Sequence, residues 1–428
     1  MILCYGVTCR ESGGEAADAA VWLELHPHCI CFHDDFAPCT VQEWRRTGRQ
    51  RVSSAFIYTS KFDDFSLGES HPFKPYKGTM VFELCYRYGL LDEPWIEVLE
   101  PEPASEEDML EYHQREYVEA LKSANTGSFD FTLLEYGLGT GDNPVFKGVY
   151  DFSLLVLGAT LLGAALISSG KVNTVFSPVG GLHHAGYDHA EGFCYVNDIV
   201  IAIKRLLKGG MKKIIYVDID AHHGNGVQDA FYDSDEVLFI SLHQSGDTLY
   251  PWSGFENEMG NGKGLGYTVN VPLSEYTDDD TYVRAFEAVY TPLAEAFRPD
   301  CVVAQIGLDT LKKDPLTNLR LTNNGYIRVL EEIKKSCSKI LALGGGGYSV
   351  PDVVRGWTLA WAVLNGLKPY DPYQGIISGN LTPFTQGPDE LYDPPYHLAE
   401  NIKLDLDAYI EKKIAYIREN IFPLHGIG

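Results

Sequence analysis

From residue 53 onward, short apolar runs alternate with longer segments whose apolar positions recur at helical spacing. The runs are rich in β-branched residues and end in polar ones, at 174–177, 214–220, 237–243, 301–307 and 340–344. Helical periodicity covers 151–169, 195–207, 280–297, 324–335 and 351–364. Nearly continuous apolar strands between amphipathic helices are typical of a parallel sheet that is buried on both faces. We therefore expect an α/β fold with a mainly parallel central sheet and helices on both of its faces.

The two ends of the chain differ from this alternating region. Residues 1–52 are rich in Cys and His and end in a basic stretch, so we interpret them as an N-terminal extension of uncertain structure. The Cys/His cluster at 26–33 is spaced too tightly for the usual structural zinc pattern, and a loose extension is the favoured interpretation. Residues 53–428 are expected to form one domain, with an irregular Pro- and Gly-rich segment at 372–396 and a last amphipathic helix at 405–422.

The charge balance narrows the classes of partner. The chain has 34 basic and 59 acidic side chains, a formal net charge of −25. Such a surface repels phosphate backbones and anionic lipid, so a cationic substrate is favoured over nucleic acid or a membrane surface. The longest apolar stretch, 154–167, is interrupted by glycine and alanine and predicts a buried helix. The first residues lack the basic and hydrophobic regions of a signal peptide, so we expect a cytoplasmic protein.

The densest group of polar side chains closes the apolar run 214–220. Alternation places Asp218, Asp220 and His222 on one face. Two carboxylates at the end of an apolar strand are costly to bury unless a cation compensates them. We therefore predict a metal site here, with a salt bridge or cap at the strand end as the alternative explanation.

A third metal ligand has to come from another strand. Asp309 follows the run 301–307, and the carboxyl ends of parallel strands meet at one edge of a sheet. Asp220, His222 and Asp309 would leave a coordination position open for water and substrate, which is the layout of a catalytic site. Zinc is the first expectation, and Fe(II), Co(II) and Mn(II) also accept these ligands. Taken alone, Asp309 would equally suit a helix N-cap.

Two further motifs carry groups suited to acid–base and oxyanion chemistry. His183 and His184 follow two glycines, and imidazoles can take a proton from water and pass it to a leaving amine. A structural or surface role is the alternative for such a pair. Four glycines at 344–347 precede Tyr348, whose hydroxyl is placed to donate a hydrogen bond to an oxyanion. The glycine run lacks the patterns of a phosphate-binding loop.

Four motifs in order, at 180–185, 192–198, 218–226 and 343–348, resemble those of the histone deacetylase superfamily. The resemblance extends over about 54–367. Residues 71–75 resemble the first rim loop of that superfamily, and 135–146 are most similar to the bacterial acetoin-utilisation deacetylases. The resemblance implies an arginase/deacetylase-type fold and metal-dependent hydrolysis of N6-acetyl-lysine in proteins to lysine and acetate. It also suggests a place in acetoin or acetate metabolism.

The resemblance assigns roles to matching positions. It implies zinc binding by Asp220, His222 and Asp309, and catalysis by His183, His184, Asp218 and Tyr348, with Asp218 orienting His183. The implied walls of a narrow tunnel for the lysine stem are Gly192, Phe193 and Tyr250, with Asp142 holding the substrate backbone at the rim. Structural potassium is implied at two sites, one at Asp218, Asp220, His222, Ser241 and Leu242 and one at Phe231, Ser234, Val237 and Tyr267.

Three positions depart from common patterns of that superfamily. Tyr250 stands where a Phe is common, so the polarity of the tunnel stays open. Asn225 stands where many members have an Asp partner for the second His, although other branches also carry Asn. Lys77, in the first rim loop, stands where the eukaryotic nuclear enzymes usually have Arg, so regulation by inositol phosphate is not expected.

The expected partner is an acetylated protein or a small acetylated amine, and the sequence does not determine the oligomeric state. An acetylpolyamine amidohydrolase of the same fold is one alternative, which an acidic rim residue would favour. A two-manganese ureohydrolase would need more metal-binding carboxylates and has no use for Tyr348 or the His pair. A module that binds acetyl-lysine without turnover is the remaining alternative, and the complete set of metal ligands, base and tyrosine argues against it.

Overall fold

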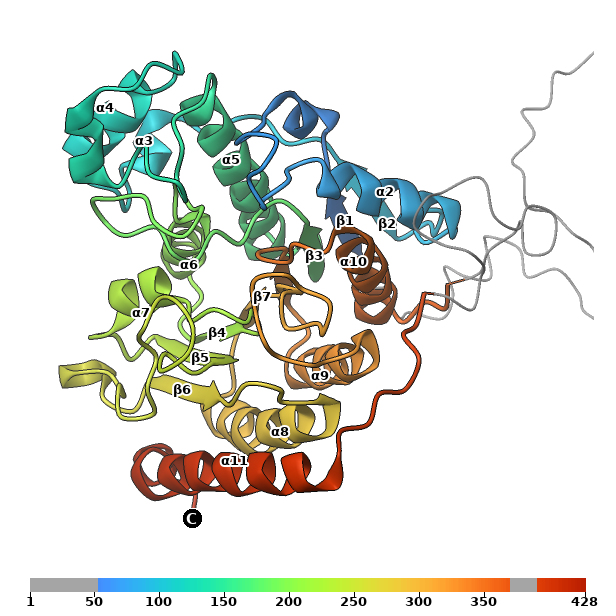
Figure 1. Cartoon of the computed structure of the whole chain (residues 1–428). Coiled ribbons are helices and arrows are strands. Elements are labelled where there is room, and N and C mark those ends of the chain that lie inside the picture. The colour runs from blue at the N-terminus through green and yellow to red at the C-terminus, as the bar shows by residue number, and fades with distance from the viewer. Residues whose placement is uncertain (1–52, 370–390) are drawn as a thin grey trace, which may run out of the picture. The chain divides into compact units, whose positions relative to one another are not determined.

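The computed structural model describes residues 53–369 and 391–428, and an eight-stranded sheet runs through this part of the chain (Figure 1). Its order is β2-β1-β3-β8-β7-β4-β5-β6, and every neighbouring pair is parallel. The strands are β1 Ser54–Ile57, β2 Ile96–Leu99, β3 Thr174–Ser177, β4 Ile214–Asp218, β5 Val237–Gln244, β6 Thr268–Leu273, β7 Cys301–Gln305 and β8 Ile340–Leu343. The predicted parallel sheet is confirmed.

Helices cover both faces of this sheet (Figure 1). Helix α5 packs against β1, β3 and β8, and α6 packs against α5, while α2, α8, α9 and α10 form the opposite layer and α11 lies against α8 and β6. The helices are α2 Lys77–Arg87, α3 Glu106–Met109, α4 Arg115–Ser123, α5 Val149–Ser168, α6 Asp198–Lys208, α7 Asn225–Phe231, α8 Asp279–Phe297, α9 Asn323–Ser336, α10 Val350–Asn365 and α11 Glu400–Asn420. Short 3-10 turns lie at η1 Ser60–Asp64, η2 Phe131–Tyr136, η3 Gly262–Gly264 and η5 Phe422–His425.

Strand β4 shows why the central runs are apolar throughout. Ile215 and Val217 face the core on the side of α8, α9 and α10, whereas Ile214 and Tyr216 face the core on the side of α5 and α6. Successive side chains of a strand point to opposite faces, so a strand covered on both sides needs apolar residues at every position. The apolar runs therefore reflect the two-sided core.

The elements that the sequence did not reveal lie mainly at the edges of the sheet and before residue 149. Strands β2 and β6 are the two edge strands, and β6 contains Pro272, which lacks the N–H of a central-strand residue. Helix α6 begins at Asp198, later than predicted, because the Asn197 side chain caps it by accepting from the N–H of Val200. The predicted extension 1–52 and most of the predicted irregular segment 372–396 lie outside the described residues.

Helix α5 is, within the described ranges, the single helix long and apolar enough to cross a membrane by length and composition. Its most apolar window is 67% buried inside the protein, and it packs against α6 and three strands of the sheet. Burial of this kind is typical of a core helix, which agrees with the buried helix predicted for 154–167.

Candidate active site

Four neighbouring strands, β3, β8, β7 and β4, deliver the polar motifs to one edge of the sheet. The loop after β3 carries His183 and His184, and the loop after β8 carries Tyr348. Asp309 follows β7, while Asp220 and His222 follow β4. Because all four strands are parallel, their carboxyl ends lie side by side, and the predicted site residues come together there.

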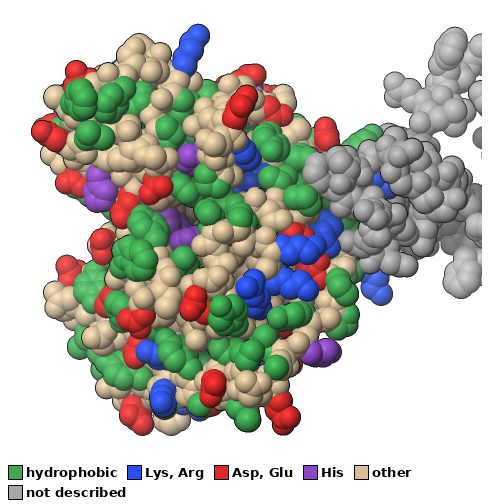
Figure 2. Space-filling view, viewed as in Figure 1, with side chains coloured by type: hydrophobic (Ala, Val, Ile, Leu, Met, Phe, Trp, Pro, Cys, Tyr) green, Lys and Arg blue, Asp and Glu red, His purple; other side chains and the backbone are tan. Residues whose placement is uncertain are grey.

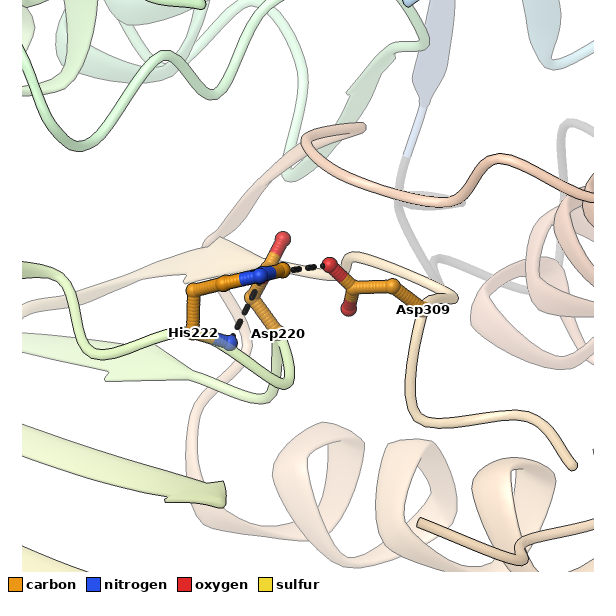
Figure 3. A group of neighbouring side chains, drawn as sticks. All are labelled: Asp220, His222 and Asp309. Atoms are coloured by element: carbon orange, nitrogen blue, oxygen red, sulfur yellow. Dashed lines mark hydrogen bonds and ion pairs between the residues drawn. The ribbon is translucent and has the colours of Figure 1, made fainter. Parts of the chain in front are cut away.

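Asp220, His222 and Asp309 form a compact buried group (Figure 3). Their ligand atoms all lie within 4.8 Å of one another, and His222 Nδ1 is 3.1 Å from Asp220 Oδ1 and 2.9 Å from Asp309 Oδ2. Other donors hold the far oxygens of the two carboxylates. Asp220 Oδ2 accepts from Gln305 Nε2 at 2.7 Å, and Asp309 Oδ1 accepts from the N–H of Ala221 at 2.7 Å. One oxygen of each carboxylate is thus left facing the imidazole.

The electrostatics of this group fit a bound cation. Burial, and then the charge of Asp220, raises the pKa of Asp309. Burial alone would lower the pKa of His222, but the two carboxylates raise it to about 10, so they draw positive charge to this position. Two carboxylates and an imidazole suit zinc and related divalent ions. The residues present therefore fit a catalytic divalent metal.

The glycine run after β8 passes directly against the candidate metal ligands. A Cβ on Gly346 would lie 2.4 Å from Asp309 Oδ2 and 2.6 Å from Asp220 Oδ2, which is closer than real contacts allow. Gly345 and Gly347 have φ values of +90° and +118°, which side chains rarely adopt. Close approach to these carboxylates, rather than phosphate binding, explains the run. The run delivers Tyr348, whose ring centroid lies 5.7 Å from that of Phe193.

The two predicted catalytic histidines have different partners. His183 Nδ1 lies 2.8 Å from Asp218 Oδ2, and His184 Nδ1 lies 2.7 Å from Asn225 Oδ1. Burial lowers the pKa of His183, but the charges of Asp218 and Asp220 outweigh it, so the pKa lies above its ordinary value. Burial, together with the charges of His183 and His222, holds the pKa of His184 well below its ordinary value.

The Nε2 atoms of the two histidines face each other, and this contact shows where the proton between the rings lies. The Nε2 atoms of His183 and His184 are 3.0 Å apart. Two lone pairs would repel at that distance, so one of the nitrogens carries a proton. His184 Nδ1 faces the amide oxygen of Asn225, so Nε2 is the bare nitrogen of a neutral His184 ring and the proton between the rings lies on His183; the directions of the two pKa shifts agree with this. His184 is then the base of the pair, and environments that push two pKa values apart are typical of acid–base pairs.

A pocket opens beside this pair, and it contains most of the predicted tunnel residues. Its lining consists of Phe73, Gly181, Leu182, His183, His184, Gly192, Phe193, Cys194, Gly345, Gly346 and Tyr348. The ring of Tyr250 lies next to it, 5.2 Å from that of His184 and 6.3 Å from that of His222. Asp142 is exposed, and His71 Nε2 lies 3.1 Å from its backbone oxygen. On the face shown in Figure 2, acidic and basic side chains are interspersed with hydrophobic ones.

The residues predicted to bind potassium surround two ends of the β4–β5 region. At the carboxyl end, Asp218 pairs with Ser241, and Leu242 follows it. Near the amino end of β5, the N–H of Ser234 donates to Phe231 O at 2.9 Å, and Val237 begins the strand. Tyr267 O accepts from the N–H of Phe239 at 2.9 Å. Potassium binding at both places stays a prediction.

Sequence reasoning missed several residues that support the site. Asp198 accepts from the N–H groups of Gly181 and Leu182 at 2.9 and 2.8 Å and so holds the loop that leads to the His pair. Gln305 ends the otherwise apolar strand β7 and donates to Asp220. A polar residue in that apolar run could have been noticed from the sequence. Glu191, half-buried and next in the chain to the pocket residue Gly192, accepts from Asn225 Nδ2 at 3.0 Å, and nothing in its local sequence indicated this contact.

Lys77 lies elsewhere than the rim loop in which the sequence placed it. It begins helix α2 and is 1% exposed. Its Nζ donates to Gly345 O at 2.9 Å and to Gly347 O at 3.3 Å, and it lies 4.8 Å from the ring centroids of Phe73 and Trp357. Burial lowers its pKa to about 8. Lys77 therefore holds the glycine run in place through two hydrogen bonds from its buried position.

Comparisons with known proteins agree with this geometry. The histone deacetylase domain matches residues 71–364. The acetoin utilization protein AcuC of Bacillus subtilis is 36% identical over 327 residues, which are 74% of this chain and 83% of that protein. Histone deacetylase 1 of Homo sapiens is 36% identical over 393 residues, 90% of this chain and 78% of that protein.

Solved structures are similar over most of the chain. The structure of an HDAC homolog from Aquifex aeolicus has a TM-score of 0.74 and 31% identity, and the match covers 85% of this chain and 100% of that one. An HDAC homolog in complex with SAHA gives a TM-score of 0.73 and 30% identity over the same shares of the two chains. The arginase/deacetylase-type fold expected from the sequence is confirmed.

Proposed function

Because this chain belongs to the histone deacetylase family, we propose that it hydrolyses the acetyl amide of N6-acetyl-lysine in proteins, releasing lysine and acetate. The observation that carries the proposal is a pocket lined by a buried histidine and a tyrosine, whose wall residue Gly346 lies directly against the carboxylates of the three-residue metal group. Each of these features has another explanation alone, but amide hydrolysis uses all three.

A divalent metal, with zinc as our first choice over Fe(II), Co(II) or Mn(II), would be held by Asp220, His222 and Asp309 and would supply Lewis acidity for attack on the carbonyl. The Tyr348 hydroxyl donates a hydrogen bond to the acetyl oxygen as negative charge develops there. Neutral His184 accepts a proton from the attacking water at Nε2. Asp218 fixes His183, and the histidine pair returns a proton to the amine nitrogen as the C–N bond breaks.

The pocket walls support a substrate with an unbranched apolar stem. Phe193 and Tyr250 flank the approach to the histidine pair, and a lysine side chain can lie between two rings while its polar end reaches the metal group. We propose that the exposed carboxylate of Asp142 binds the backbone of the substrate at the rim. The name of the Bacillus subtilis relative supports a role in acetoin or acetate metabolism. We also propose a cytoplasmic location, which cell fractionation would test.

One observation favours a second substrate class. Asp188 and Glu191 lie in the loop that leads to the pocket residue Gly192, where both contact His189, and an acetylated polyamine would bring a free ammonium group to them. The test is acetate release by the zinc-loaded protein from acetyl-lysine peptides and from acetylputrescine. The deacetylase proposal predicts a higher kcat/KM on the peptides. A preference for acetylputrescine would support the second class, and turnover of neither would contradict both.

A further inference from the structure

Asn225, the hydrogen-bond partner of His184, is also hydrogen-bonded to a second side chain. Asn225, the first residue of α7, presents Oδ1 to His184 Nδ1 at 2.7 Å and donates from Nδ2 to Glu191 Oε2 at 3.0 Å. Glu191 immediately precedes the pocket residues Gly192 and Phe193. The side chain of Glu191 is 33% exposed, and the proposed chemistry gives it no task.

The side-chain amide of Asn225 could form a hydrogen bond with His184 in either of two orientations. The oxygen and nitrogen ends of an asparagine have nearly the same shape, but one accepts a hydrogen bond and the other donates. With the oxygen toward His184, Nδ1 of the ring must carry the proton. With the nitrogen toward His184, Nδ1 must be bare, and the proton of the neutral ring moves to Nε2. An aspartate would offer an oxygen either way.

We propose that Glu191 is a positioning residue, whose carboxylate locks the Asn225 amide with its oxygen toward His184 and so keeps the lone pair of His184 on Nε2. An ionised carboxylate only accepts hydrogen bonds, so the amide must turn its NH₂ group toward Glu191. Nε2 is the nitrogen that faces His183 Nε2 at 3.0 Å. The inference rests on the proposed function, in which His184 accepts a proton at that atom.

Contacts on its outer side hold Glu191 ionised and in place. Burial raises the pKa of Glu191, but hydrogen bonds, first of all from His189, outweigh burial and leave it below its ordinary value. His189 Nε2 lies 3.4 Å from Glu191 Oε2, and its Nδ1 lies 2.8 Å from Asp188 Oδ1. The backbone of Glu191 is fixed by a pair of hydrogen bonds with Cys194, at 3.1 and 2.8 Å. The contacts therefore run without a break from the buried base to the surface.

The proposal is tested by turnover in two backgrounds. Glu191→Gln can donate as well as accept, so it releases the lock, and kcat on a capped, uncharged acetyl-lysine amide should fall by about 2- to 10-fold with little change in KM. Glu191→Lys can only donate, so it should invert the amide and lower kcat further, by about 10- to 100-fold. In an Asn225→Asp background, Glu191→Gln should not lower kcat, because an aspartate has no donor end that could turn toward His184, and the new amide can donate to the aspartate where two carboxylates would repel.

Asp229→Asn is the matched control, since it removes an exposed carboxylate whose charge acts on Glu191 from α7 and leaves the Asn225–Glu191 bond intact. The control should retain kcat. Losses that are equal in Asp229→Asn and Glu191→Gln would mean that negative charge near Asn225 alone matters and would overturn the proposal. An equal effect of Glu191→Gln in the wild-type and Asn225→Asp backgrounds would also overturn it.

A spectroscopic measurement separates this inference from the proposed function. In zinc-loaded protein labelled with ¹⁵N at histidine, His184→Gln identifies the His184 signals. Nδ1 should have the shift of a protonated nitrogen and Nε2 that of a bare one, and Glu191→Gln should move the two shifts toward each other. This result needs no turnover, so it stands even if acetyl-lysine is not the substrate. Shifts that do not change in Glu191→Gln would contradict the lock.

Discussion

His183 and His184 are neighbours in the chain and are both buried, but they belong to differently built surroundings. His183 bonds to Asp218, a carboxylate with no solvent exposure at the end of a central strand. His184 bonds to the neutral amide of Asn225 at the start of α7, and Asn225 in turn donates to the carboxylate of Glu191. The pKa of His183 is raised as a result, while that of His184 is held well below its ordinary value.

The difference shows how two identical side chains can take opposite roles. A carboxylate in direct contact stabilises the imidazolium form, which raises the pKa of His183. A neutral amide orients the ring without adding charge, so His184 keeps its lone pair at neutral pH. The negative charge lies on Glu191, which contacts Asn225, and not on residue 225 itself. The amide of Asn225 still orients the His184 ring, and the greater distance weakens the effect of the charge on that ring.

Loss of the metal group should abolish the function of both histidines together, and it is the largest effect that we expect. Asp309→Ala leaves two ligands, so bound zinc should fall well below one equivalent and activity by about 10³-fold or more. Metal analysis of the purified variant and acetate release measure the two effects. A variant that keeps a full equivalent of zinc and its activity would contradict the ligand assignment.

Removal of the Tyr348 hydroxyl should leave the difference between the two histidines intact and lower kcat alone. The hydroxyl acts mainly in the transition state, so Tyr348→Phe should lower kcat by about 10²–10³-fold with little change in KM. Steady-state kinetics with unchanged zinc content is the measurement. An unchanged kcat would show that the metal polarises the carbonyl without Tyr348.

The substitution Asn225→Asp gives His184 a carboxylate partner, as His183 has in Asp218. A carboxylate beside His184 raises the pKa of the ring, and the base works only when it is neutral. Activity is lost as pH falls through that pKa, so the acidic limb of kcat/KM should move to higher pH, by about one unit. At pH values well above the pKa of His184 in both proteins, activity should be affected less. An unmoved limb in a variant with full zinc content would mean that another group, such as water on the metal, titrates there.

Tyr216→Phe changes only the surroundings of His183 and should have the smallest effect. Tyr216 donates to Asp218 Oδ2, so its loss leaves the carboxylate with one fewer hydrogen bond. We expect a loss of about 1–2 kcal/mol in the free energy of unfolding and a change in kcat of less than about tenfold. Urea unfolding of the two proteins measures the stability. A loss of activity as large as that of Tyr348→Phe would show that Tyr216 takes part in catalysis itself.

The central strands and the candidate metal ligands could be predicted because their signals are local. A run such as 214–220 contains its own burial pattern, and the polar residues that end it mark the edge where sites form. Edge strands and the elements before residue 149 lacked such a signal. Strand β2, with the sequence Ile-Glu-Val-Leu, is four residues long and half exposed, so neither length nor periodicity distinguishes it from a loop.

The sequence alone determined the fold class, because alternation and helical spacing record which face of each element is buried. It also predicted that Asp220, His222 and Asp309 meet, because each follows an apolar parallel strand and such strand ends share one edge of the sheet. Only the tertiary structure decided the strand order β3-β8-β7-β4 that joins four distant loops, the burial of Lys77 under the glycine run and the bond from Asn225 to Glu191. Periodicity says that a side chain faces inward but not which neighbour it meets, since that depends on how all the elements pack together.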